Sequence, residues 1–142
     1  MRSPQGYTAR GATMETRDRP GILVVDDEPM IRNIMVELLE RRGFRGWSAA
    51  NGQSAVETFR KHHGEITLVL AEASLATGLT GPELLESLQS IDPCVRCCFM
   101  NSTPWSSVDS ELLDRGAEEV FPKPFPPAEV VARLWDIAEG GI

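Results

Sequence analysis

Three acids and one lysine are the residues of this sequence best placed to do chemistry. Asp26 and Asp27 directly follow one run of apolar residues, and Glu72 follows a second run. Lys123 stands between two prolines after a third run. If these runs are parallel strands, their carboxyl ends meet at one edge of a sheet, where ligands bind in such folds. The four residues therefore predict a small acidic pocket covered by a cation.

The elements that must position these residues alternate from Gly21 onward. This alternation is typical of a parallel α/β sheet with helices on both faces. The expected strands cover residues 22–26, 44–49, 66–71, 95–100 and 119–122. Helices are expected from Pro29 to Gly43, after an Asn51 cap, from Gly81-Pro82, over 106–115 and after Pro126-Pro127. The apolar stripe expected to bury the first helix consists of Ile31, Ile34, Met35, Leu38 and Leu39.

The combination of motifs resembles the receiver domain of two-component response regulators, from Gly21 to about Ala138. It consists of Asp26-Asp27-Glu28-Pro29, the Ala-Ala-Asn-Gly run at 49–52, Gly81, Gly116-Ala117 and Lys123-Pro124-Phe125. The resemblance implies a doubly wound, flavodoxin-like α/β fold with a five-stranded parallel sheet in the order 2-1-3-4-5. In that family the acid in the place of Glu72 is an aspartate, which accepts the phosphoryl group.

The resemblance also assigns roles to the other pocket residues. Asp26 and Asp27 would hold Mg²⁺, a cation that prefers carboxylate and water oxygens. Lys123 would contact the phosphoryl group or its substitute, and the Lys123–Pro124 bond would be cis. We expect any Mg²⁺ site formed by Asp26 and Asp27, with or without Glu72, to be weak.

Glu72 is the main departure from the family pattern. Its carboxylate would be displaced by more than about 1 Å relative to aspartate, and such a misplacement can lower a rate on the order of 100-fold. The displaced oxygens would lie near the positions of phosphoryl oxygens, with a charge of about −1 instead of roughly −2. Two interpretations of Glu72 stay open. It partly imitates a phosphorylated aspartate, or it simply abolishes phosphorylation.

Two switch positions depart as well. The family usually has a Thr or Ser hydroxyl at the end of its fourth strand, and that place falls on Asn101, with Ser102 as the other candidate. The Asn101 amide can donate a hydrogen bond to Glu72. The family often has an aromatic residue three positions before the lysine, where this chain has Val120. The loop 73–80 is one residue longer than the common form.

These features favour a stand-alone, receiver-like signalling domain that is not an enzyme and acts by binding a protein. It would be a pseudo-receiver, with a histidine kinase or a downstream effector as partner. The alternative is an active, Mg²⁺-dependent phosphoacceptor. A flavodoxin-like cofactor binder is disfavoured, because Asp26 and Asp27 would repel a phosphate after the first strand.

Composition narrows the class of protein. The 142 residues suffice for one domain, and a net charge of −7 argues against nonspecific nucleic-acid binding. No run of about 20 apolar residues and no apolar stretch behind Arg2 occur, so we expect neither a membrane span nor a secretory signal. Three cysteines fit a reduced cytoplasmic protein. Residues 1–20 are expected to form a flexible tail, in which Met14 is an alternative start, and residues 21–142 the domain.

The three cysteines, Cys94, Cys97 and Cys98, invite a metal or redox interpretation. Cys97 and Cys98 are adjacent in an expected strand and point to opposite faces, so they cannot both turn toward Cys94. We expect three buried structural cysteines.

Large rings and the two histidines have plainer interpretations. The tryptophans are Trp47, Trp105 and Trp135. Trp47 and Trp135 are either exposed anchors for a partner or half-buried packing residues. His62 and His63 are expected at a solvated helix end.

Overall fold

The computed structural model describes residues 19–103 and 107–140. Its strands are β2 (Gly21–Val25), β3 (Arg45–Ala49), β4 (Ile66–Glu72), β5 (Arg96–Asn101) and β6 (Glu119–Pro122). Its helices are α1 (Pro29–Arg42), α2 (Gly52–His62), α3 (Gly81–Ile91), α4 (Ser107–Asp114) and α5 (Pro127–Ala138). The expected tail 1–20 lies outside the described residues except for its last two, and Trp105 and the expected helix start at 106 lie outside them too.

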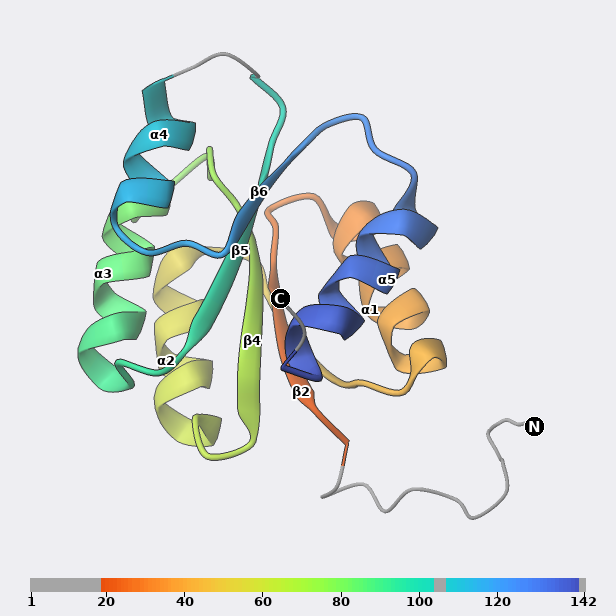
Figure 1. Cartoon of the computed structure of the whole chain (residues 1–142). Coiled ribbons are helices and arrows are strands. Elements are labelled where there is room, and N and C mark those ends of the chain that lie inside the picture. The colour runs from red at the N-terminus through yellow and green to blue at the C-terminus, as the bar shows by residue number, and fades with distance from the viewer. Residues whose placement is uncertain (1–18, 104–106, 141–142) are drawn as a thin grey trace.

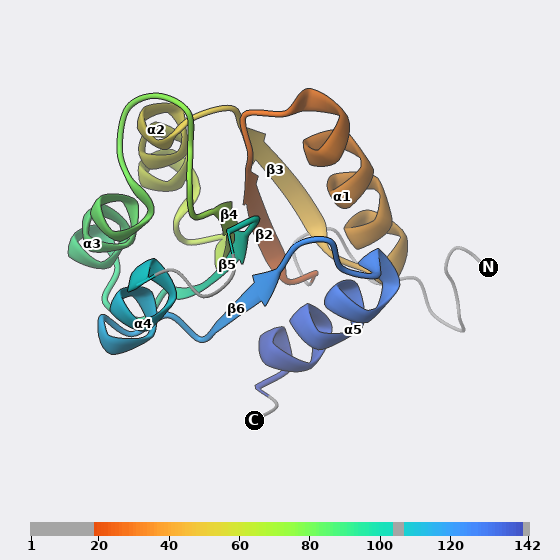
Figure 2. The ribbon, with the colours of Figure 1, turned by 90° about the horizontal axis from the view of Figure 1, so that it is seen from above.

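The five strands form one parallel sheet in the order β3-β2-β4-β5-β6. In chain order this is 2-1-3-4-5, which confirms the predicted topology. Helices cover both faces (Figure 1). Seen from above, α1 and α5 lie on one side of the sheet, and α2, α3 and α4 lie on the other (Figure 2).

Alternating side chains of the central strands fill two separate cores. Val69 and Cys97 pack with the residues of α2, α3 and α4, whereas Leu70 and Cys98 pack with those of α1 and α5. All four are at most 1% exposed. Strands buried on both faces need continuous apolar runs, which is why β2, β4 and β5 were recognisable in the sequence.

Local signals start the helices where the sequence predicts them. The Asn51 side chain accepts a 2.8 Å hydrogen bond from the Ser54 N–H and caps α2. Thr80 and Glu83 form a reciprocal capping box at the start of α3. These caps fix the loops that lead away from the carboxyl edge of the sheet.

The buried stripe of α1 is narrower than predicted. Met35 and Leu39 are buried, but Ile34 is 46% exposed. Successive helical residues are rotated by about 100°, so Ile34 points away from the face that Met35 and Leu39 turn to the sheet. On α4, Leu112 is buried while Leu113 is exposed, for the same reason.

The prediction of three buried cysteines is wrong for one of them. Cys97 and Cys98 are buried in β5, on opposite faces as expected, but Cys94 is exposed. Cys94 lies in the turn between α3 and β5, outside the strand, and its backbone N–H donates to the Asp92 carboxylate. Connecting segments run over the surface, so this thiol stays in contact with solvent.

The two described tryptophans are half-buried packing residues. Trp135 packs edge-on against Phe44, with ring centroids 5.2 Å apart. The guanidinium of Arg45 lies over the Trp47 ring, 4.6 Å from the centroid of that ring. The His62 ring lies beside Trp47. Within the described ranges, no helix is long and apolar enough to cross a membrane.

Candidate functional site

Glu72, Asp26 and Lys123 form a buried charged cluster at the carboxyl edge of the sheet. The Lys123 Nζ lies 2.6 Å from Oε1 of Glu72 and 3.4 Å from Oδ2 of Asp26. Glu72 is 4% exposed and Asp26 is 1% exposed. The sequence predicts an acidic pocket covered by a cation, and Lys123 is the cation that contacts both acids.

Strand register brings the three side chains together. Val25 of β2 pairs with Ala71 of β4, so Asp26 and Glu72 follow at neighbouring strand ends. The backbone N–H of Lys123 donates a 2.8 Å hydrogen bond to the carbonyl of Asn101 at the end of β5. Its long side chain reaches past β5 to Glu72, and the Lys123–Pro124 bond is cis, as predicted.

Backbone donors complete the hydrogen bonding of both buried acids. The second Glu72 oxygen accepts from the Ser74 N–H at 3.1 Å, and Oδ1 of Asp26 accepts from the Glu28 N–H at 2.9 Å. Burial by itself lowers the pKa of the Lys123 ammonium, but the hydrogen bonds and charges of Glu72 and Asp26 outweigh burial and raise that pKa. Lys123 is therefore charged at neutral pH and offsets part of the acidic charge.

Asp27 does not join this cluster in the way a shared metal would require. Its side chain is exposed, and its Oδ2 accepts a 3.1 Å hydrogen bond from the Ala76 N–H in the loop before α3. In the described part of the chain, no three His, Cys, Asp or Glu side chains are arranged to hold a metal ion. Lys123 is the cation that contacts Glu72 and Asp26. The arrangement does not fit a three-carboxylate Mg²⁺ site.

Asn101 is the last residue of β5 and is fully buried, whereas Ser102 is exposed. The assignment of Asn101 to the family's hydroxyl position stays a prediction. Its amide nitrogen donates to the Asp109 carboxylate of α4, and its Oδ1 accepts from the N–H and hydroxyl of Thr103. A hydrogen bond from this amide to Glu72 stays a prediction. Sequence reasoning missed Asp109, whose only signal was an acid in a first helical turn.

Val120 lies opposite Phe99 in the pairing of β5 with β6. It is half-buried and packs against the core that contains α2, α3 and α4. A short β-branched side chain has one strongly preferred rotamer in many settings and no ring to swing outward. The position offers no aromatic switch.

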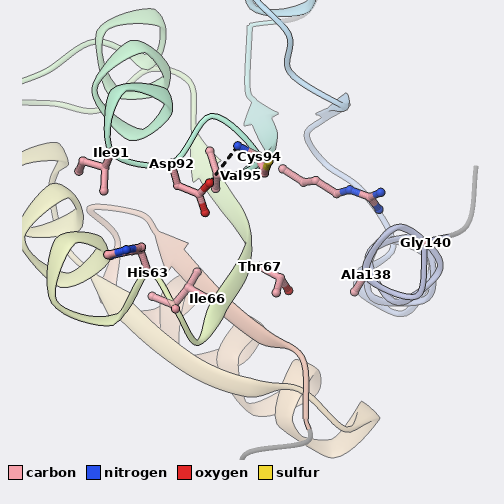
Figure 3. Close-up of a pocket in the computed structure, with 11 residues that line it drawn as sticks. His63, Ile66, Thr67, Ile91, Asp92, Cys94, Val95, Ala138 and Gly140 are labelled. Carbon is pink, nitrogen blue, oxygen red and sulfur yellow. Dashed lines mark hydrogen bonds between the residues drawn. The ribbon is translucent and has the colours of Figure 1, made fainter.

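A separate hollow of about 550 Å³ lies at the opposite, amino edge of the sheet (Figure 3). It is bordered by the first residues of β4 and β5, by the ends of α3 and α5, and by the turns that precede both strands, among them Ile66, Arg96 and Cys94. It was not predicted from the sequence. The hollow and the charged cluster lie at opposite ends of the strands.

Residues 22–135 match the response regulator receiver domain family. The chain belongs to this family. Sporulation initiation phosphotransferase F of Bacillus subtilis is 32% identical over 104 residues, which cover 73% of this chain and 82% of that protein. The transcriptional regulatory protein CseB of Streptomyces coelicolor is 32% identical over 118 residues, but this chain spans only 48% of it.

Solved receiver structures share the fold. A receiver domain protein from Clostridium thermocellum superposes with a TM-score of 0.79 at 21% identity, covering 85% of this chain and 95% of that one. A response regulator of the LuxR family from Aurantimonas has a TM-score of 0.77 at 26% identity, covering 87% of each chain. The chain is therefore a receiver domain of the response regulator type, with glutamate at the end of its central strand.

Proposed function

We propose that this receiver domain is a pseudo-receiver, which signals by binding a protein partner and does not accept phosphate. The ion pair between Lys123 and Glu72 carries this proposal. We further propose that the domain acts in the cytoplasm, that it is not an enzyme, and that its partner is a histidine kinase or a downstream effector. The chain's net charge of −7 makes nucleic acid an unsuitable partner.

Hydrogen bonding fixes the direction of the Glu72 carboxylate, and the length of its side chain places it wrongly for attack on a phosphoryl group. One oxygen is held at 2.6 Å by the Lys123 ammonium and the other at 3.1 Å by the Ser74 N–H. Both bonds fix the direction of the oxygens. The extra methylene of glutamate also moves the carboxylate away from the reach of aspartate, and about 1 Å of misplacement can lower a rate on the order of 100-fold.

The same ion pair supports a fixed signalling state. In receivers a lysine at this place contacts the phosphoryl group, and here Lys123 contacts a permanent carboxylate. The cluster holds a charge of about −1 from Glu72 where a phosphoryl group would hold roughly −2. The affinity for the partner distinguishes the two interpretations of Glu72. If Glu72 imitates a phosphorylated aspartate, Glu72→Gln lowers this affinity. If Glu72 only abolishes phosphorylation, Glu72→Gln leaves it unchanged.

Intact-protein mass spectrometry after treatment with acetyl phosphate and Mg²⁺ tests the proposal. The wild-type chain should gain no phosphoryl mass. Glu72→Asp should gain a fraction that is labile at high pH, because Asp26, Asp27 and Lys123 remain and only the reach of the nucleophile changes. Asp27→Asn in the Glu72→Asp background is the control for a pocket with one acid fewer. If wild type is labelled as readily as Glu72→Asp, the chain is an active phosphoacceptor and the proposal fails.

A further inference from the structure

The side chain of Asn101 ties the end of β5 to the first turn of α4. Asn101 is 0% exposed. Its amide nitrogen donates to a carboxylate oxygen of Asp109, and its carbonyl oxygen accepts from the Thr103 N–H at 3.0 Å and the Thr103 hydroxyl at 2.9 Å. One buried amide thus holds a helix residue and a residue that follows the strand.

Only one orientation of the amide suits these neighbours. The Asp109 carboxylate can only accept a hydrogen bond, and the Thr103 N–H can only donate one. Rotating the amide by half a turn would set its oxygen against the carboxylate and its NH₂ group against the N–H. A Thr or Ser hydroxyl has a single polar atom, so it could not present a donor to Asp109 and an acceptor to Thr103 at two separate positions.

The backbone of Asn101 joins this network to the charged cluster. Its carbonyl accepts the 2.8 Å hydrogen bond from the Lys123 N–H. Its neighbour in β5, Met100, pairs with Glu72 of β4. Asn101 therefore lies between the charged cluster and α4.

We propose that Asn101 and Asp109 are positioning residues that hold the first turn of α4 against β5. This inference rests on the proposed function, because it names α4 as the element that the fixed signalling state would hold in place. The tests below use no phosphate, so they decide this inference independently of whether the chain is phosphorylated.

Hydrogen–deuterium exchange of peptides from α4, followed by mass spectrometry on the full chain, tests the proposal. Asp109→Ala should speed exchange about tenfold to hundredfold, as expected for loss of a hydrogen bond to a charged group. Asp109→Asn should stay within a few-fold of wild type, because its amide oxygen still accepts from Asn101. Asp114→Ala removes an exposed acid of the same helix and should change little.

The two Asp109 variants separate the hydrogen bond from simple charge. An acid in the first turn also stabilises a helix through its dipole, and Asp109→Asn removes that charge as fully as Asp109→Ala does. Equal exchange in these two variants would therefore overturn the proposal, and so would wild-type exchange in Asp109→Ala. Asp109 is only half-buried, so these variants are not expected to unfold the domain.

A reciprocal exchange of side chains supplies a rescue. Asn101→Asp sets two carboxylates against each other and should speed exchange in α4 at least as much as Asp109→Ala. Adding Asp109→Asn restores one donor facing one acceptor, and Thr103 still donates to residue 101. Exchange in the double variant should return to within a few-fold of wild type. A double variant as fast as Asn101→Asp alone would contradict the direct contact.

Discussion

Polar side chains differ in burial between the carboxyl edge and the amino edge of the sheet. At the carboxyl edge, Glu72 and Asp26 are almost completely buried and share one ammonium, Lys123. At the amino edge, Cys94 is exposed and Arg96 donates to a backbone carbonyl at the end of α5. A buried charge needs a partner, whereas an exposed group is satisfied by water. The carboxyl edge is therefore the part of this molecule whose charges depend on one another.

The largest expected effect is a difference in reactivity between the exposed thiol of Cys94 and the buried thiols of β5. In native protein at pH 8, iodoacetamide should label Cys94 on the order of 1,000-fold faster than Cys97 or Cys98, which need an opening of the fold. Burial also raises the pKa of both strand thiols, that of Cys98 to about 12, so they carry little reactive thiolate. Peptide mass spectrometry gives the rates, and equal rates in native protein would contradict the burial of β5.

Removing the shared cation should cost the most stability. Lys123→Met leaves Glu72 and Asp26 buried without their ammonium, and we expect a loss of about 3 kcal/mol in the free energy of unfolding. Urea denaturation at pH 7 followed by circular dichroism measures it. Lys61→Met, which removes the exposed lysine of α2, is the matched control and should change stability by less than about 0.5 kcal/mol. Equal losses in the two variants would show that the cluster is not coupled.

Mg²⁺ affinity should sharpen the contrast between Glu72 and the aspartate of the family. Wild type should bind Mg²⁺ at least about tenfold more weakly than Glu72→Asp, because the longer side chain and the Lys123 contact disturb the ligand geometry. Titration of tryptophan fluorescence with MgCl₂ measures both. Saturable wild-type binding at micromolar Mg²⁺ would be inconsistent with the charged cluster described above.

The smallest effect concerns stability at high pH. A pKa that is raised in the folded state contributes stability below the unfolded pKa, which is lost as the pH rises through the folded pKa. Cys97 and Cys98 therefore weaken the fold from about pH 8.5 upward, and Lys123 adds its loss above about pH 10.4. The stability difference between wild type and Lys123→Met should be constant up to about pH 10 and then shrink. A difference that grows with pH would reverse the assigned sign.

The sequence was sufficient for the fold and for placing Asp26, Glu72 and Lys123 at one edge of the sheet. It was insufficient for the direction of the Asp27 side chain and for the hydrogen-bond partners of the site. Continuous apolar runs and helix caps mark the strands and helix starts, and strand ends that carry acids must meet at one edge. The direction of Asp27 toward the Ala76 N–H and the contact between Asn101 and Asp109 depend on loop geometry that no periodicity encodes. The exposure of Cys94 likewise depends on where the turn before β5 ends.

β6, one of the two outermost strands of the sheet, limits how this domain can associate with other molecules. β6 has only four residues and ends in Pro122, which has no N–H to donate. Short edge strands and prolines prevent a sheet from being lengthened by a strand of another molecule. The domain is therefore protected at this edge against strand-by-strand aggregation.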